Sequence, residues 1–210
     1  MNVTVLGASG RTGRLLVQEL LRRGHRVTAL VREPSRAPED TRVVAGDSRD
    51  GEALRAALAG VDAVVSALGP SGKDADLHRQ TVAQLVPALR AAGVSRYVGV
   101  SGAGVTAAGD RKSVRDRVIS AAMGWFAPSM VADKAAELAA WQDSGAEWTL
   151  VRPPRLLEGP PTGRVEHDAH VSTRSTGMRR ADLAVFLADV LDQGLYIRQA
   201  PFAATAGRGS

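Results

Sequence analysis

Met1-Asn2-Val3-Thr4-Val5-Leu6-Gly7-Ala8-Ser9-Gly10-Arg11-Thr12-Gly13 opens the chain and decides its fold. The stretch predicts a buried strand, a glycine-rich turn and then an amphipathic helix over residues 11–23 that ends at Gly24. Glycines let the backbone bend tightly and approach a ligand, and a helix N-terminus offers unpaired N–H groups and partial positive charge. Together, these elements predict a cradle for the phosphates of a nucleotide.

The spacing of the glycines narrows this prediction. Gly7, Gly10 and Gly13 follow the pattern G-x-x-G-x-x-G, not the common dinucleotide pattern G-x-G-x-x-G. The Lys-Ser/Thr pair of an ATP-type loop is absent. A tight turn with a purely structural role is the alternative, but the strand before it and the helix after it favour nucleotide binding.

Strand and helix patterns alternate along the rest of the chain, which predicts an α/β fold with a doubly wound, mainly parallel sheet of Rossmann type. We expect one domain over residues 1–210, with residues 104–130 and 155–178 covering the substrate site. The predicted strands cover residues 3–6, 27–31, 41–45, 63–67, 97–100 and 148–151, with a possible edge strand over 196–204. The predicted helices cover residues 11–23, 52–58, 74–92, 111–124, 133–143 and 180–192, and the chain is expected to be irregular after Pro153-Pro154.

Composition excludes several functional classes. The 27 Lys and Arg residues exceed the 22 Asp and Glu residues, giving a net charge of +5, but the arginines are scattered and few aromatic residues stand among them. That pattern argues against nucleic-acid binding. With no cysteine, no disulfide, thiol nucleophile or Cys-ligated metal is possible. We expect a cytoplasmic protein, monomeric or homodimeric, that acts on a small molecule, with no metal and no membrane partner.

Loops after parallel strands carry the ligands of doubly wound sheets, so these loops supply the candidate residues. The second strand ends at Arg32, where a dinucleotide with a free ribose 2′-hydroxyl is usually met by Asp or Glu. Arg32 suits the 2′-phosphate of NADP(H), and Arg11 could close the other side, although a merely solvated Arg32 is the alternative. The candidate cofactor residues on these loops are Gly7, Ser9, Gly10, Arg11, Thr12, Gly13, Arg32, Asp47, Ser48, Ala67, Leu68 and Gly69, with Asp47 and Ser48 expected near the adenine amine.

Several short motifs carry a resemblance to a known family. They are the glycine turn, Val31-Arg32, Gly46-Asp47, Val100-Ser101-Gly102-Ala103, Asp133-Lys134 and Trp148-Thr149-Leu150-Val151-Arg152-Pro153. Over residues 1–192 the chain resembles the atypical short-chain dehydrogenases/reductases. It is most similar to the NAD(P)H-binding branch that contains biliverdin reductase B/flavin reductase and the NmrA-like proteins. The resemblance implies a Rossmann fold, NADPH binding and hydride transfer to flavins, quinones, biliverdin or other planar or carbonyl acceptors.

The same resemblance implies roles for three residues and shows one departure. Ser101 matches the active-site serine, Lys134 is expected to act in catalysis and bond the nicotinamide ribose, and Pro153 is expected to shape the wall that holds the carboxamide. Typical members use Tyr-x-x-x-Lys, but Met130 stands where the tyrosine would be, and it has no proton to give. We therefore expect water or a nearby hydroxyl to supply the proton. A redox sensor without turnover and a biosynthetic isomerase, epimerase or dehydratase are the alternatives.

The regions expected to cover the substrate contain distinctive side chains. Met123, Trp125 and Phe126 suit a planar acceptor, although an ordinary packing helix is an equal alternative. In the second region Arg155, Arg164 and Arg174 would attract an acidic substrate.

Four histidines complete the inventory of titratable groups. His167 and His170 lack the partners of a metal site, and we expect His78 to lie on the surface. No G-x-S-x-G elbow is present, which argues against a serine hydrolase.

Overall fold

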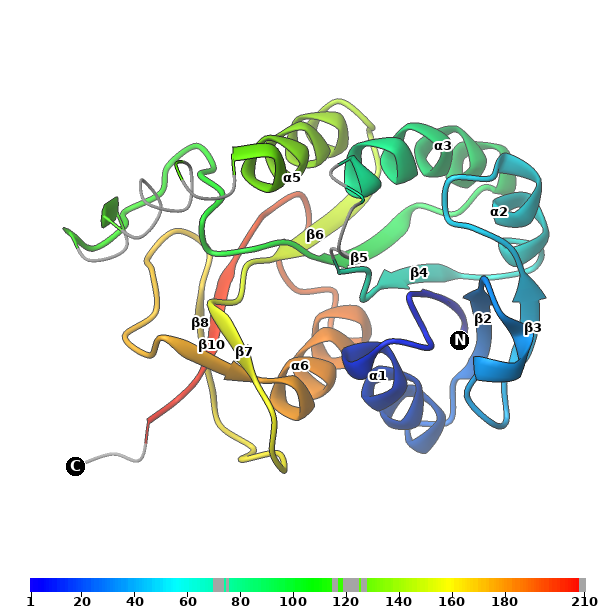
Figure 1. Ribbon diagram of the computed structural model, residues 1–210, viewed down its shortest axis with the longest axis horizontal. Helices are drawn as coiled ribbons and strands as arrows, with labels where there is room; N and C mark the ends of the chain where they lie inside the picture. Colours follow the sequence, from blue (N-terminus) through cyan, green and yellow to red (C-terminus); the bar gives the residue numbers. More distant parts are fainter. Residues whose placement is uncertain (70–73, 75, 115–116, 119–124, 126–127, 208–210) are drawn as a thin grey trace.

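The computed structural model describes residues 1–69, 74, 76–114, 117–118, 125 and 128–207. Six parallel strands form one sheet in the order β3-β2-β1-β4-β5-β6 (Figure 1). The strands are β1 (Asn2–Leu6), β2 (Arg26–Val31), β3 (Arg42–Ala45), β4 (Ala63–Ser66), β5 (Arg96–Val100) and β6 (Glu147–Val151). The strand order reverses between β1 and β4, and ligands of such sheets bind at the carboxyl ends of strands around this point. The predicted Rossmann-type fold is confirmed.

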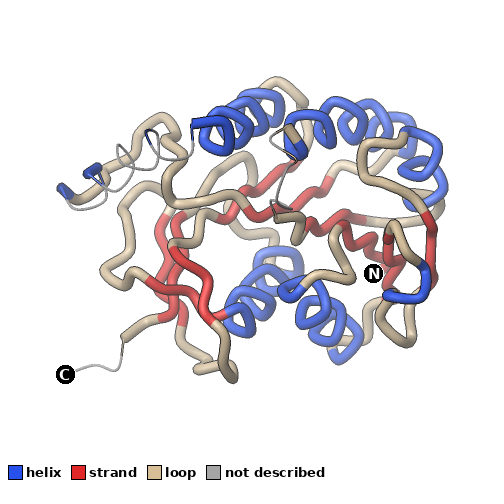
Figure 2. The backbone as a smooth tube through the Cα atoms, in the orientation of Figure 1, coloured by secondary structure: helices blue, strands red, loops and turns tan. Residues whose placement is uncertain are grey.

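Helices cover both faces of the sheet (Figure 2). Helices α1 (Arg11–Arg22) and α6 (Arg180–Asp192) cover one face, and α2 (Gly51–Ala57), α3 (Leu77–Ala92) and α5 (Pro128–Gln142) cover the other (Figure 1). A short 3-10 helix, η1 (Pro34–Arg36), follows β2. Helix α6 has the predicted bounds, whereas α5 begins five residues before the predicted start at Asp133.

Apolar side chains fill the spaces between the sheet and each helix layer. A parallel strand covered on both faces needs apolar residues on both, and β1 and β4 meet this requirement with every residue from Val3 to Leu6 and from Ala63 to Ser66 buried. One cluster includes Val3, Val5, Leu16, Leu20, Leu183 and Leu187, and the other includes Leu6, Leu54, Val64, Leu85, Trp141 and Leu150.

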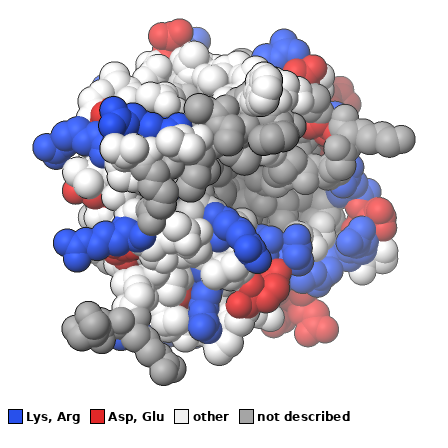
Figure 3. Space-filling model, turned by 60° about the vertical axis from the view of Figure 1, so that its left-hand side comes forward, with Lys and Arg blue, Asp and Glu red and all other residues white. Residues whose placement is uncertain are grey.

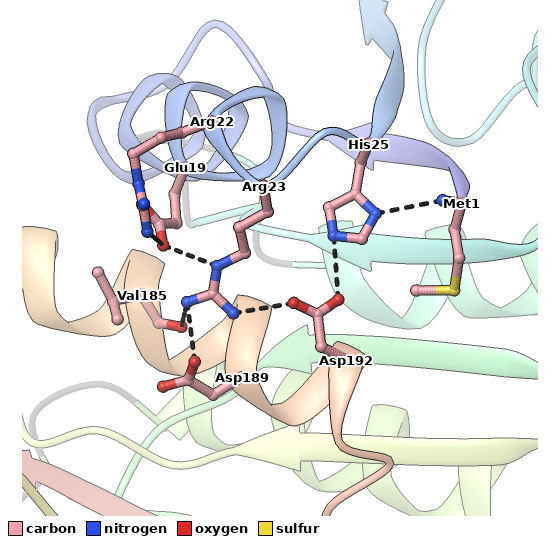
Figure 4. A network of polar contacts seen from close by, with 8 residues as sticks. All are labelled: Met1, Glu19, Arg22, Arg23, His25, Val185, Asp189 and Asp192. Atoms are coloured by element: carbon pink, nitrogen blue, oxygen red, sulfur yellow. Dashed lines mark hydrogen bonds and ion pairs between the residues drawn. The ribbon is translucent and has the colours of Figure 1, made fainter.

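Helices α1 and α6 are also joined by charged groups (Figure 4). The Arg23 guanidinium lies 2.7 Å from Glu19, 2.8 Å from Asp189 and 2.9 Å from Asp192. His25 continues the network, because its Nε2 lies 3.0 Å from Asp192. The arginines hold the pKa of Glu19 at about 2, mainly through the hydrogen bonds from Arg22 and then those from Arg23.

The chain after Pro154 is more regular than the sequence predicts. Strands β7 (Arg155–Leu157) and β9 (Gly177–Arg179) form a parallel pair, and β8 (Val165–Asp168) pairs with β10 (Phe202–Thr205) in antiparallel fashion. The expectation of an irregular segment was therefore wrong. These strands are only three or four residues long, and each pairs with a segment distant in sequence, so no long local pattern predicts them.

Two other expected elements need correction or lie outside the described part. The edge strand predicted over 196–204 is shorter, and isolated bridges join this segment to β6 and the residue after it, at Thr149 with Gln199 and at Arg152 with Phe202. Much of the helix predicted over 111–124 falls on residues 115–116 and 119–124, which lie outside the described residues. Within the described ranges, no helix is both long and apolar enough to cross a bilayer.

Candidate active site

The glycine turn brings the end of β1 against the end of β4. Gly7 has a φ of +74°, and a Cβ there would lie 3.0 Å from backbone atoms of Ala67 and Leu68. Gly13 sits against the same turn, because its Cβ would lie 2.0 Å from the Gly7 carbonyl oxygen. Helix α1 then starts after Gly10 without a side-chain cap, which leaves its first N–H groups without a side-chain acceptor. A backbone cradle of this kind fits the pyrophosphate of a dinucleotide.

A cavity of 190 Å³ lies beside this turn at the carboxyl ends of β1 to β4. The structure brings together nine of the predicted cofactor residues along its wall: Gly7, Ser9, Gly10, Arg32, Asp47, Ser48, Ala67, Leu68 and Gly69. The sequence reasoning missed six further lining residues: Leu6, Leu30, Val31, Gly46, Asp74 and Leu77. Leu6, Leu30, Val31 and Gly46 lie within two residues of the loops that begin at Gly7, Arg32 and Asp47, so their positions next to these loops were the signal for them.

Arg32 and Asp47 both line this cavity, but only Asp47 has hydrogen-bond partners for its charged group among the described residues. The Arg32 side chain is exposed and donates no hydrogen bond to the described residues. The Asp47 carboxylate accepts two hydrogen bonds from the Arg49 guanidinium, at 2.8 and 2.9 Å, and this contact lowers the pKa of Asp47. The Ser48 hydroxyl lies 2.9 Å from that of Thr81. A ligand entering this cavity therefore meets a guanidinium at Arg32 that donates no hydrogen bond among the described residues, and groups at Asp47 and Ser48 that already have hydrogen-bond partners.

Arg11 and Thr12 point away from the cavity walls. The Arg11 guanidinium lies 3.1 Å from Glu158, and the Thr12 hydroxyl accepts a hydrogen bond of 2.9 Å from Arg180. Arg180 also lies 2.8 Å from Glu158. These contacts join the start of α1 to the start of α6. Arg11, which was expected to close the other side of the cavity, is thus already paired with Glu158.

A second cavity, of 590 Å³, lies beyond the ends of β5 and β6. Ser101 and Pro153 line it, and the wall is otherwise made of Gly102, Ala103, Gly104, Pro154, Arg155, Leu156, Ser172, Thr173, Ser175, Thr176 and Phe202. The Ser101 Oγ is buried, and it has no hydrogen-bond partner in the described part of the chain. A buried hydroxyl without a partner at a cavity wall is suited to bind a polar atom of a ligand.

The two regions expected to cover the substrate contribute unequally. Six lining residues of the second cavity lie within 155–178, whereas Gly104 is the one lining residue from the described part of 104–130. Trp125 is 86% exposed, and Met123 and Phe126 lie outside the described residues.

Arg152 supports the second cavity from behind. It is fully buried, and its guanidinium donates to both carboxylate oxygens of Asp110, at 2.6 and 2.7 Å, and to the Ala200 carbonyl at 2.6 Å. It also stacks 3.8 Å from the centre of the Phe202 ring. Arg152 therefore fixes the loop after β5 and the segment before β10 to the end of β6. The motif Arg152-Pro153-Pro154 marks this position in the sequence, but it does not predict that Arg152 bonds to Asp110 and Ala200.

Lys134 lies inside the protein and lines neither cavity. Its Nζ is 2.9 Å from Nδ1 of His78, 2.8 Å from the Val100 carbonyl oxygen and 3.1 Å from Glu137. Burial lowers the pKa of Lys134 and raises that of Glu137, and it lowers the pKa of His78 to about 3. The expectation of a surface His78 was wrong, because the charged groups of α5 give the imidazole a buried partner.

Neither tyrosine lines the cavity beside Ser101. Tyr97 is buried and stacked on Trp141 with ring centres 3.9 Å apart, and burial raises its pKa. The Tyr196 hydroxyl lies 2.6 Å from Nδ1 of His167. Met130 is in α5, as the spacing from Lys134 requires. In the described residues, no cluster of three or more His, Asp or Glu side chains could hold a metal ion.

Comparisons with known proteins agree with this geometry. A family model described as NAD(P)H-binding matches residues 7–194. A 3-diazoavenalumate denitrifying reductase from Streptomyces is 41% identical over 114 residues, which cover 48% of this chain and 38% of that protein. The chain therefore spans well under two thirds of the length of this curated relative.

Solved structures resemble the chain over nearly its whole length. A candidate exported protein from Burkholderia pseudomallei is 32% identical with a TM-score of 0.78, covering 97% of this chain and 99% of that one. A candidate NADH-flavin reductase from Streptococcus pneumoniae is 25% identical with a TM-score of 0.81, covering 98% and 100%.

Proposed function

Because this chain belongs to the NAD(P)H-binding family, we propose that it is an NADPH-dependent reductase of a small conjugated or carbonyl acceptor, such as a flavin, a quinone or a biliverdin-like compound. The observation that carries the proposal is the pair of cavities at one edge of the sheet. The glycine turn borders the first, and the unpartnered Ser101 hydroxyl borders the second. Strands β4 and β5 are neighbours in the sheet, so the two cavities lie beside adjacent strand ends.

The first cavity offers what a dinucleotide needs. The backbone around Gly7 and the start of α1 would hold the pyrophosphate, and Arg32 would pair with a 2′-phosphate. NADPH supplies a hydride to the acceptor when it is bound. The exposed, unpaired guanidinium of Arg32 favours NADPH over NADH, because no carboxylate at the end of β2 lines the cavity to accept a ribose hydroxyl.

The second cavity offers a place for the acceptor. Glycine, proline, Leu156 and Phe202 give an apolar wall that suits a planar body, and Ser101 would bond its polar atom or pass a proton to it. With Met130 in place of a tyrosine, an acceptor that needs no dedicated protein acid is favoured. Positioning the two reactants would supply most of the rate.

The test is oxidation of NADPH by the purified protein in the presence of FMN, biliverdin or a quinone series, with NADH in parallel. We expect turnover with at least one acceptor and a preference for NADPH. In S101A we expect kcat to fall about a hundredfold, with the affinity for NADPH unchanged. Tight NADPH binding without turnover of any acceptor would contradict the proposal.

A redox sensor is the second candidate, and one observation favours it. Met130 and Lys134 stand at the positions of the usual Tyr-x-x-x-Lys pair. Met130 cannot donate a proton, and the amine of Lys134 is buried and hydrogen-bonded within the protein. A sensor would bind NADPH and NADP⁺ with different affinities and change its conformation, which limited proteolysis with each nucleotide would report.

A further inference from the structure

A third cavity contains arginines that the proposed reaction does not use. It has a volume of 700 Å³ and lies between β9, the loop at residues 161–164 and the segment after β10. Arg155, Arg164 and Arg179 line it, and among the described residues no Asp or Glu side chain does. Figure 3 shows the side of the molecule that carries this region, and Lys and Arg side chains project from it.

Two of these guanidinium groups are free to take a ligand. Among the described residues, the side chains of Arg155 and Arg164 donate no hydrogen bond, and both are exposed. Arg179 differs, because it already donates to the Pro160 carbonyl at 3.0 Å. Exposed, unpaired arginines with a common cavity present the fork of donors that matches a carboxylate or a phosphate.

Two acids accept hydrogen bonds from residues that line this cavity, and both bind neutral groups instead of its arginines. Asp182 is buried and accepts hydrogen bonds from the Thr162 N–H, the Thr162 hydroxyl and the Thr205 hydroxyl, at 2.7 to 2.9 Å. Glu166 accepts a hydrogen bond of 2.6 Å from the Ser175 N–H. Among the described residues, neither carboxylate forms a hydrogen bond or ion pair with Arg155 or Arg164, so both guanidinium groups keep their donors for a ligand.

The position of the third cavity indicates whether its arginines would bind the acceptor or the dinucleotide. Arg155, Ser175 and Thr176 line both this cavity and the cavity beside Ser101, so the two are contiguous. It shares no lining residue with the cavity at the glycine turn. An anion held here would thus belong to the acceptor and not to the dinucleotide.

We propose that Arg155 and Arg164 bind an anionic group, a carboxylate or a phosphate, carried by the acceptor whose reacting body lies beside Ser101. This inference rests on the proposed reductase function for its choice of ligand. The substrate class is then an acceptor with an apolar conjugated body and an anionic arm long enough to reach past Arg155.

The experiment compares acceptors that share a body and differ in the anion. FMN is paired with riboflavin, and biliverdin with its dimethyl ester, and the affinity of each is measured by fluorescence quenching or absorbance titration. We expect the anionic member of at least one pair to bind about tenfold more tightly to the wild-type protein. That preference should disappear in R155A/R164A and reverse in R155E/R164E, while R26A, an exposed arginine at the opposite edge of the sheet, keeps it.

Binding is measured apart from turnover, so the two proposals fail separately. Absence of NADPH oxidation with preserved selection of the anionic member would contradict the reductase and leave the anion site intact. Absence of any preference for the anionic member of either pair, whether both members bind equally or neither binds, would overturn the anion site. A preference that persists in R155A/R164A would overturn it as well.

Discussion

The amine of Lys134 lies 2.9 Å from Nδ1 of His78, and this contact directs the lysine into the protein. A lysine ammonium has three donors, and Lys134 uses them on His78, on the Val100 carbonyl and on Glu137. No donor is left for a ribose hydroxyl in this arrangement. The bond to Val100 instead joins α5 to the end of β5, immediately before Ser101.

Replacing Lys134 separates its structural role from a role in cofactor binding. We expect K134M to lower the free energy of unfolding by about 3 kcal/mol, because it leaves Glu137 buried without its partner. K134M/E137L removes both charges and should recover most of that loss. Urea denaturation followed by circular dichroism measures both values.

The same double variant tests the ribose contact. We expect K134M/E137L to bind NADPH within about twofold of the wild type, because the donors of Lys134 are spent inside the protein. If a well-folded double variant loses about tenfold or more in affinity for NADPH, Lys134 does contact the ribose directly.

Burial of His78 predicts a dependence of stability on pH. The folded protein holds the pKa of His78 at about 3, against 6.5 for the free side chain, so the unfolded chain takes up a proton first as the pH falls. Stability from this group is therefore complete above pH 6.5 and is lost as the pH falls toward 3, by up to about 1.4 kcal/mol per pH unit. Asn keeps an acceptor for Lys134 but does not titrate, so H78N should lose stability more slowly than the wild type between pH 6.5 and 4. Parallel curves for the two proteins would contradict this account.

The glycine turn can be tested with a single methyl group. A Cβ at Gly13 would lie 2.0 Å from the Gly7 carbonyl oxygen, and backbone atoms on both sides cannot yield without moving α1. We expect G13A to destabilise the protein by about 3 kcal/mol and to weaken dinucleotide binding. G102A is the control for stability, because a Cβ there has no atom within 4 Å. Equal melting temperatures for G13A and G102A would show that α1 shifts freely.

The sequence predicts the parts of this molecule that depend on local pattern. Residues 3–6 and 63–66 are apolar except for Thr4 and Ser66, and each run lies next to a turn or helix signal, so the six strands and the first cavity follow from periodicity and glycine positions. The second cavity depends on Phe202 and Arg152, which meet only because the chain returns from α6 along β6. No local sequence pattern predicts that the chain after α6 runs back along β6. Likewise, His78 looks like a surface residue in its own helix, and only the charges of α5 explain its burial.

The charged network between α1 and α6 predicts an acid-sensitive contribution to stability. We expect R23A to lower the free energy of unfolding at pH 7 by about 2 kcal/mol, since Arg23 joins Glu19 to Asp189 and Asp192. The pKa of Glu19 is depressed from 4.5 to about 2, so its share of this stability is present above pH 4.5 and is lost as the pH falls toward 2. The difference between R23A and the wild type should therefore shrink in that range. A difference that stays constant down to pH 2 would assign the effect to packing of the arginine stem.

We expect Arg32 to decide which dinucleotide the first cavity prefers. Its guanidinium is exposed, unpaired among the described residues and part of the cavity wall, so a 2′-phosphate would supply its partner. In R32D, the carboxylate would repel that phosphate and could accept a ribose hydroxyl instead. We expect the dissociation constant for NADPH to rise about thirtyfold while that for NADH changes by less than about threefold, measured by quenching of protein fluorescence. R26D, with the same change of charge at the other edge of the sheet, separates this contact from the effect of net charge. If R32D weakens NADPH and NADH equally, Arg32 does not read the 2′-phosphate, and the preference for NADPH loses its support.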